Sequence, residues 1–261
     1  MNVVRMQQKV SETEWQARVD LAACYRLAAH YGWTDLILTH ISARVPDETG
    51  PDGGECFLIN PMGYMFHEIT ASCLVKVDIN GKVLSESDYD INPAGFTIHS
   101  AVHMAKPDIN WVVHTHTAAG TGVATQKDGI LPLTQHSLVV ISHTGYHDYE
   151  GIATDLDERE RLARDLGDNK VLVLRNHGLL TVGATPGEVF MWMYRAERAC
   201  RMQLAVQQAG AELIQVPEDV QQATFDRNKF NNSDKGFRTI GKVEWPGLLR
   251  QLDRIDPSYK T

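Results

Sequence analysis

Two histidines stand one residue apart in the stretch WVVHTHTAAG, residues 111–120, directly after an apolar run. Successive side chains on a strand point to opposite faces, so His114 and His116 would project from one face, with Thr115 on the other. Two imidazoles in this arrangement can bind one metal ion at the roughly 2.0–2.1 Å that zinc requires. The alternative is that both are half-exposed strand residues that bond to water or to the backbone.

A third histidine, His177, occupies the turn in RNHGLL. The apolar run VLVL precedes this turn and LLTV follows it, so two strands would fix the direction of His177. Gly178 would let the backbone pass close to whatever His177 touches. Three histidines from two rigid elements, with an open fourth position, form the pattern of a catalytic zinc site. The alternative for His177 is a turn residue bonded to its own backbone.

A helix in INPAGFTIHSAVHMAKPD carries two more histidines. Phe96, His99 and His103 recur at helical spacing, so they share one face. If that face points toward the strand with the paired histidines, His99 is a candidate fourth ligand or acid/base group. A buried histidine bonded to a backbone carbonyl is the equal alternative.

The elements that must position these residues alternate between helix and strand. Ser11 and Glu14 form a capping box for a helix over 12–31. Short β-branched runs predict strands over 35–82, and later strands are expected at 111–117, near 131–141 and on both sides of RNHG. Helices are expected from Pro93, over 117–126, over 155–167, and from Pro186 to Gly210, and 145–151 is expected to be a loop. This order predicts an α/β/α three-layer domain with a central, mostly antiparallel sheet.

The predicted organisation has three parts: an N-terminal extension over 1–12, the α/β domain over 13–215, and a C-terminal tail over 216–261 that packs on the core or on a neighbouring subunit. The net charge is −8 with no Lys/Arg cluster, which argues against nucleic-acid and polybasic membrane partners. No apolar run approaches the roughly 18 residues of a membrane helix, and the start turns polar too early for a signal peptide. With four cysteines and no CxxC, we expect a cytoplasmic protein with free thiols.

The chain resembles the class II aldolase/adducin family over roughly residues 14–210. HTHTAAG and RNHGLL match the family's histidine motifs, and LTHISARV, MFHEITASCLVKVD, INPAGFTIHSAVHMAKPD and GYHDYEGI are similar to the adducin head region. The resemblance implies a class II aldolase-like fold, with Zn²⁺ or another divalent metal held by His114, His116 and His177. It also implies a small-molecule substrate and a homotetramer with active sites between subunits.

One position departs from the family pattern. The family's aldolases carry a carboxylate near the start of the helix that precedes the paired-histidine strand, as fourth ligand and catalytic base, and that position here is Gly95. Candidates to replace the base are His99, His136, which lies where some members carry a tyrosine from a neighbouring subunit, and Tyr149 in the loop GYHDYEG. A turn held by its own side-chain hydrogen bonds is the alternative for that loop.

The family's phosphate loop is changed as well. Its Asn appears here as His40, and the backbone at Gly63 remains as an anion contact, so these two residues are the candidates for substrate binding. Pro93 and Ala94 replace small polar residues that grip phosphate in the family. A phosphorylated ketose is therefore less favoured than a small non-phosphorylated substrate.

The expected chemistry is that of a zinc lyase. A three-histidine zinc with open positions acts as a Lewis acid and stabilises the enediolate left when a carbon–carbon bond breaks, in a retro-aldol cleavage or a decarboxylation. Decarboxylation tolerates the loss of a carboxylate base better, because no hydroxyl proton is removed. The expected substrate is a small hydroxy-oxo compound. The alternative is a non-catalytic, adducin-like oligomeric binding module with a vestigial metal site.

Overall fold

The computed structural model describes residues 3–49, 54–84, 87, 89–151, 157–233, 235–236 and 239–261. Within them, seven strands form one sheet in the order β3-β2-β1-β4-β7-β6-β5. The strands are β1 (His40–Thr49), β2 (Glu55–Ile59), β3 (Val75–Asp78), β4 (Trp111–Thr115), β5 (Thr144–His147), β6 (Val171–Leu174) and β7 (Gly178–Gly183). Neighbours are antiparallel except β5 and β6, which are parallel. The mostly antiparallel sheet is therefore confirmed.

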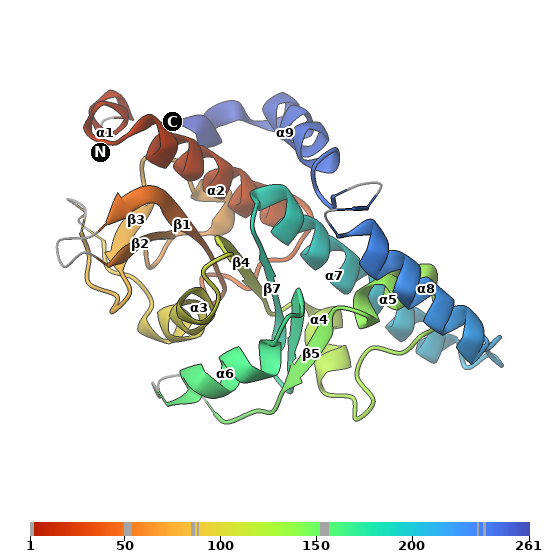
Figure 1. Ribbon diagram of the computed structural model, residues 1–261. Coiled ribbons are helices and arrows are strands. Elements are labelled where there is room, and N and C mark those ends of the chain that lie inside the picture. The colour runs from red at the N-terminus through yellow and green to blue at the C-terminus, as the bar shows by residue number, and fades with distance from the viewer. Residues whose placement is uncertain are drawn as a thin grey trace.

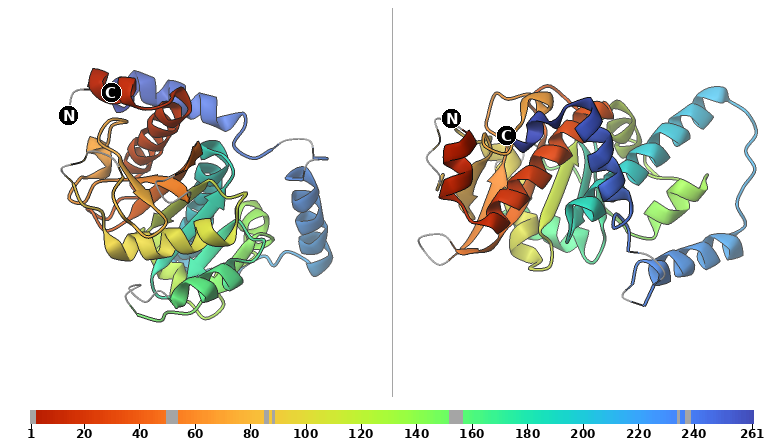
Figure 2. Two further views of the ribbon diagram at one scale, coloured as in Figure 1. Left: turned by 60° about the vertical axis from the view of Figure 1, so that its left-hand side comes forward. Right: turned by 90° about the horizontal axis from the view of Figure 1, so that it is seen from above.

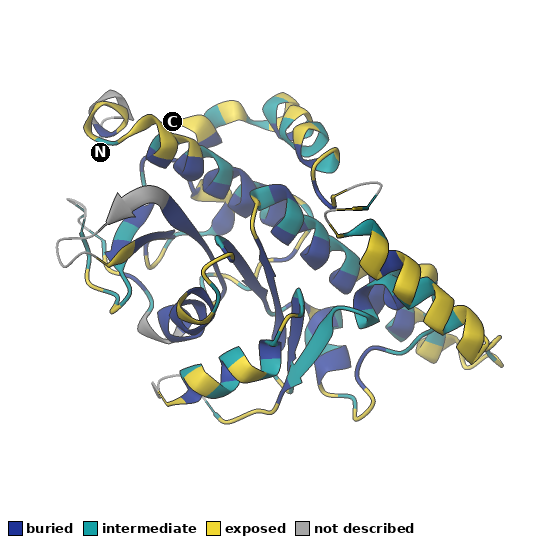
Figure 3. Cartoon of the chain, viewed as in Figure 1, coloured by how far each residue is buried: buried dark blue, intermediate teal, exposed yellow. Residues whose placement is uncertain are grey.

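Helices cover both faces of the sheet, which gives the expected three layers (Figure 1). One face packs against α2 (Glu12–His30) and α7 (Pro186–Ala209), and the other against α3 (Pro93–Ala105) and α6 (Glu158–Leu166). The strand alternation divides the core accordingly: Val113 belongs to the cluster under α2 and α7, whereas Val112 belongs to the cluster under α3 and α6. Figure 3 shows the central strands buried between these layers.

Local signals set the ends of the long helices as expected. Ser11 Oγ accepts a hydrogen bond from the backbone N–H of Glu14 at 3.0 Å, which caps the first turn of α2. Thr185 caps α7 in the same way, with Glu188 N at 3.1 Å. Gly210 ends α7 in the left-handed region, at φ 61°. The predicted positions of these two helices are thus confirmed.

The region between α4 (Ala118–Ala124) and α6 differs from the prediction. The strand expected near 131–141 is instead helix α5 (Gln135–Ile141), and the loop expected at 145–151 begins with strand β5. Thr134 Oγ1 accepts from Ser137 N at 3.2 Å, and this cap starts a helix where the apolar run alone fits either structure. The pairing of β5 with β6 is a tertiary contact that the polar run GYHDYEG does not signal.

The C-terminal part adds two helices outside the predicted domain. Helix α9 (Glu244–Ile255) lies on α2, where Trp245 Nε1 donates to Asp20 Oδ1 at 3.2 Å. Helix α8 (Glu218–Asn231) lies beside α5, where Asn228 Nδ2 donates to the Val139 carbonyl at 2.8 Å. Figure 2 shows α8 set away from the sheet. The domain boundaries at residues 13 and 215 stay predictions.

Three further short helices complete the described elements: α1 (Val3–Lys9) and the 3₁₀ turns η1 (Phe66–Glu68) and η2 (Pro257–Lys260). Among the helices in the described part of the chain, none combines the length and apolarity needed to cross a membrane.

Candidate metal centre

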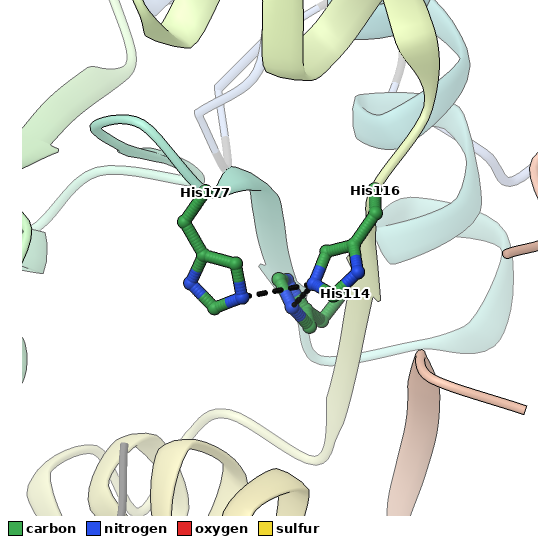
Figure 4. A group of neighbouring side chains, drawn as sticks. All are labelled: His114, His116 and His177. Carbon is green, nitrogen blue, oxygen red and sulfur yellow. Dashed lines mark hydrogen bonds between the residues drawn. The ribbon is translucent and has the colours of Figure 1, made fainter. Parts of the chain in front are cut away.

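Strand β4 and the β6–β7 turn bring three histidines together. His116 Nε2 lies 2.9 Å from His114 Nε2 and 2.8 Å from His177 Nε2. Figure 4 shows the three rings, from the end of β4 and from the turn, pointing toward one another. Within the described residues these side chains form the one group of histidines, cysteines or carboxylates arranged to hold a metal ion. The structure thus brings together all three of the proposed ligands.

The turn that carries His177 is fixed on several sides. Asn176 adopts a left-handed φ of 58°, which Asn tolerates better than most residues. The backbone N–H of His177 donates to the Leu174 carbonyl at 3.0 Å, and Thr121 Oγ1 donates to the His177 carbonyl at 3.1 Å. A Cβ atom at Gly178 would lie 2.3 Å from the Thr115 carbonyl oxygen, so only glycine lets the turn approach β4 this closely.

Two of the three imidazoles have a hydrogen-bond partner on the nitrogen that faces away from the group. His114 Nδ1 lies 3.0 Å from the Leu179 carbonyl, and His116 Nδ1 lies 3.2 Å from Asp35 Oδ2. A carbonyl or a carboxylate can only accept, so each Nδ1 carries the proton and each Nε2 of a neutral ring keeps its lone pair. This is the arrangement by which second-shell acceptors orient histidine ligands of metals.

This donor set fits a divalent metal. Lone pairs of His114 and His116 face each other, and burial and the neighbouring histidines lower the pKa of His114 well below its usual value. Burial, followed by His116 and His147, lowers the pKa of His177 to about 4. A cation between the nitrogens satisfies lone pairs that the rings cannot satisfy among themselves. Nitrogens bound to a tetrahedral zinc lie roughly 3.3 Å apart, so small ring movements would accommodate one.

The three histidines open onto a cavity of about 300 Å³. The other described residues that line it are Leu38, His40, Asn92, Gly95, Ile98, Tyr149 and Gly151. The walls therefore combine the histidines with apolar side chains and few polar groups, which is typical of a small-molecule site.

His40 and Gly95 are adjacent in this cavity. His40 begins β1 and pairs in register with His114, so their side chains share one face of the sheet. The His40 side chain is only 3% exposed, and neither ring nitrogen has a hydrogen-bond partner among the described residues. Burial, followed by His116 and His177, lowers the pKa of His40 to about 4. The residue predicted to bind substrate thus lies beside the position that lacks a carboxylate.

His99 is fully buried and does not line the cavity. Its Nδ1 lies 2.6 Å from Ser42 Oγ, which also lies 2.9 Å from His103 Nε2, and His103 Nδ1 lies 3.3 Å from the Ile109 carbonyl. Burial, followed by His40 and His103, lowers the pKa of His99 well below its usual value. Both helix histidines are buried, but within the described residues only His103 contacts a backbone carbonyl, and His99 lies behind the site against Ser42.

The other three candidates lie in different places. Tyr149 lines the cavity and is 55% exposed, so it is a rim residue that a substrate can reach. His136 lies on α5, outside this cavity, where burial and then Arg198 and Arg195 lower its pKa. Gly63 adopts a φ of 91° in its turn and is not among the residues that line the cavity. A role for His136 at a neighbouring subunit's site stays a prediction.

Most of the loop GYHDYEG is held by contacts with neighbouring segments of the chain. Tyr146 OH accepts from the Ile130 N–H at 3.1 Å, His147 Nδ1 lies 2.7 Å from Asp165 Oδ2, and Arg161 Nε donates to Glu150 at 2.8 Å. Within this loop, Tyr149 and Gly151 are the described residues that reach the cavity. The loop is therefore a structured rim rather than a cluster of acid/base groups.

Sequence reasoning missed Asp35 and Ser42. Asp35 contacts His116 across 81 positions of the chain, and no local pattern announces such a contact. Ser42 stands two residues after His40, so the period of a strand places both side chains on one face. The spacing of His40 and Ser42 in LTHISARV therefore predicts that Ser42 lies on the same face as His40.

A family model described as "Class II Aldolase and Adducin N-terminal domain" matches residues 19–204. A Pseudomonas aeruginosa protein, whose name assigns it provisionally to the class 2 aldolases, is 53% identical over 256 residues, covering 98% of this chain and 96% of that protein. Alpha-adducin of Rattus norvegicus is 37% identical over 254 residues, which cover 94% of this chain and 34% of the adducin.

Solved structures show the same fold. A Pseudomonas syringae protein described as belonging to the aldolase II superfamily has 46% sequence identity and a TM-score of 0.89, covering 98% of this chain and 100% of that one. An L-fuculose 1-phosphate aldolase from Glaciozyma antarctica has 26% identity and a TM-score of 0.79, covering 96% of this chain and 93% of that enzyme.

Proposed function

The chain belongs to the class II aldolase and adducin family, and from this premise we propose that it is a metal-dependent lyase. Its reaction cleaves a carbon–carbon bond in a small hydroxy-oxo substrate, by retro-aldol cleavage or by decarboxylation. The observation that carries the proposal is the convergence of three imidazole nitrogens, two of them on rings oriented by second-shell acceptors. Zinc is the proposed metal, since neutral imidazole suits it and a three-histidine set leaves a position open.

The residues divide the work in a simple way. The metal, when bound, supplies a Lewis acid that stabilises negative charge on the substrate oxygen. Leu38 and Ile98 make part of the cavity wall apolar, which suits the carbon skeleton of a small substrate. Tyr149 at the rim offers a hydroxyl to a substrate that enters. Gly95 supplies no carboxylate, which favours decarboxylation over a cleavage that begins with removal of a hydroxyl proton.

A non-catalytic binding module is the second candidate, and two observations favour it. Gly95 has no side chain to serve as base. The similarity to alpha-adducin spans 94% of this chain. In such a module, a metal bound by the three histidines would have only a structural role. A substrate-sized cavity in front of the three histidines supports the enzyme over the module.

A homotetramer with small-molecule substrate sites between its subunits is also part of the proposal. It rests on the family resemblance. In such an assembly, His136 would contribute to the substrate site of a neighbouring subunit. Light scattering of the purified protein would give the mass of the assembly in solution. A monomer at micromolar concentration would remove His136 from the candidates.

The activity is tested by product release from metal-loaded protein. A panel of hydroxy-oxo acids and ketose phosphates would be screened for acetaldehyde, glycolaldehyde and CO₂. We expect one product class with the parent, and loss of at least a hundredfold in rate with His116→Ala. Metal-bound protein that is silent across the panel would favour the binding module.

A further inference from the structure

The imidazole of His40 occupies the space that a side chain at position 95 would need. A Cβ atom built on Gly95 would lie 2.3 Å from both Cε1 and Nδ1 of His40. No real Cβ contact is this short, so the glycine is required by the position of the ring. A side chain at position 95 and the His40 ring in this place therefore exclude each other, although the two positions are distant in the chain.

The His40 ring borders the cavity and has no hydrogen-bond partner among the described residues. It is nearly completely buried, and it lines the same cavity as the three histidines of the metal centre. A buried polar group without a hydrogen bond is costly, by more than the bond itself is worth once made. Both nitrogens are buried in the described ring position, so a substrate that fills the cavity would supply the missing partner once the ring turns toward it.

The cavity has little to offer a phosphate group. No lysine or arginine is among the described residues that line it. The amino end of α3 borders it, but Pro93 has no N–H, and the N–H groups of Gly95 and Phe96 donate to Asn92 at 3.4 and 3.1 Å. Arg175 lines a smaller adjoining pocket, where it donates to the carbonyls of Gln126 and Lys127. Among the described lining residues of this chain, a dianion would therefore meet no cation to pair with.

We propose that His40 is a substrate-binding residue that hydrogen-bonds a hydroxyl group of a small, non-phosphorylated substrate held at the metal centre. A neutral imidazole presents one N–H and one lone pair, and a hydroxyl can satisfy either of them. The apolar side chains of Leu38 and Ile98 line the cavity near His40 and suit a short carbon chain. They offer no partner for an additional charged group. This inference rests on the proposed function, because it needs a metal to hold the other end of the substrate.

Three hydroxamates test the inference without turnover. Acetohydroxamate, glycolohydroxamate and phosphoglycolohydroxamate chelate a metal through the same two oxygens. They differ only in whether the carbon next to the carbonyl carries a third hydrogen, a hydroxyl or a phosphate. Their dissociation constants would be measured by calorimetry on zinc-loaded protein. We expect the parent to prefer the hydroxyl compound over the methyl compound by about five- to tenfold, as one hydrogen bond provides, and to bind the phosphate compound more weakly than the hydroxyl compound.

Two variants assign this preference to His40. His40→Phe keeps a ring over Gly95 without its nitrogens, so the preference for the hydroxyl should fall to about onefold while binding of acetohydroxamate changes less than twofold. Gly95→Ala keeps the imidazole but displaces it, and should remove the preference in the same way. Gly122→Ala, where the new Cβ would meet only a flexible Leu204 side chain at 3.3 Å, is the matched control and should behave like the parent.

The outcomes separate this inference from the proposed function. A parent that binds phosphoglycolohydroxamate tenfold more tightly than glycolohydroxamate would overturn the inference. An unchanged hydroxyl preference in folded, zinc-loaded His40→Phe or Gly95→Ala would overturn it too. Failure of all three hydroxamates to bind the parent would instead count against the metal centre and the proposed function.

Discussion

Asp35 is the residue whose role at the metal centre is most open to a direct test. Its carboxylate accepts from Nδ1 of His116, and such outer-shell partners typically contribute 10–100-fold to metal affinity. Asp35→Asn should therefore weaken zinc binding by at least about tenfold, because an amide is a weaker and differently oriented acceptor. The dissociation constant would be measured by competition with a chromogenic chelator.

The control for this change is Asp108→Asn, an exposed carboxylate outside the site. It removes the same charge from the chain and should leave zinc affinity unchanged. Equal affinity in the parent and in Asp35→Asn would mean that Asp35 does not orient His116.

At the residue scale, the sequence predicted the histidines of the metal centre. It did not predict the residues that contact them from distant segments. Strand alternation predicted that His114 and His116 point the same way, although β4 ends at Thr115 and His116 follows it. The glycine after His177 indicated a close approach. The contact of Asp35 with His116 and the packing of His40 on Gly95 join distant segments of the chain. A single sequence carries no periodic signal for such contacts.

At the element scale, the approach of the β6–β7 turn to β4 holds the two halves of the metal centre in place. A methyl group on Gly178 would meet the Thr115 carbonyl at 2.3 Å and would push the turn that carries His177 away from β4. We expect Gly178→Ala to lower the free energy of unfolding by about 2 kcal/mol, as overpacking commonly does, and to weaken zinc binding as well.

Urea denaturation and zinc titration of this variant would check both effects. Gly54→Ala is the matched control, since a Cβ there meets nothing within 4 Å. A Gly178→Ala protein with parental stability and parental zinc affinity would show that the close approach is not needed.

The elements were predicted well where a cap and a periodic apolar pattern agreed. Ser11 and Pro186 marked the starts of α2 and α7, and Gly210 marked the end of α7. The prediction was wrong where a short apolar run had no length to decide between helix and strand, as in α5. It was also wrong for β5, a polar edge strand that exists because β6 offers it backbone hydrogen bonds.

At the scale of the whole molecule, buried histidines make stability depend on pH. Burial, followed by Arg44, lowers the pKa of His103 to about 3 in the folded chain, from the ordinary value of 6.5. Between these two pH values, His103 therefore binds a proton in the unfolded chain but not in the folded chain. The free energy of unfolding therefore keeps the full contribution of neutral His103 above about pH 6.5. It loses this contribution as the pH falls from there toward 3.

His103→Gln should remove this dependence, because an amide does not titrate. Below pH 6.5 the parent should lose about 1.4 kcal/mol more per pH unit than the variant. Urea unfolding at pH 7, 6 and 5 would give the two slopes. Parallel stability curves for the parent and for His103→Gln would show that His103 is not held neutral in the fold.

The central claim is that His114, His116 and His177 together hold one divalent metal ion, and metal content tests it most directly. The chain would be purified without chelators, and its metals measured by mass spectrometry beside His116→Ala and the exposed-histidine control His67→Ala. We predict close to one zinc per chain in the parent and in His67→Ala, and less than a tenth of that in His116→Ala. A parent without metal, or a His116→Ala protein with the parent's content, would contradict the account.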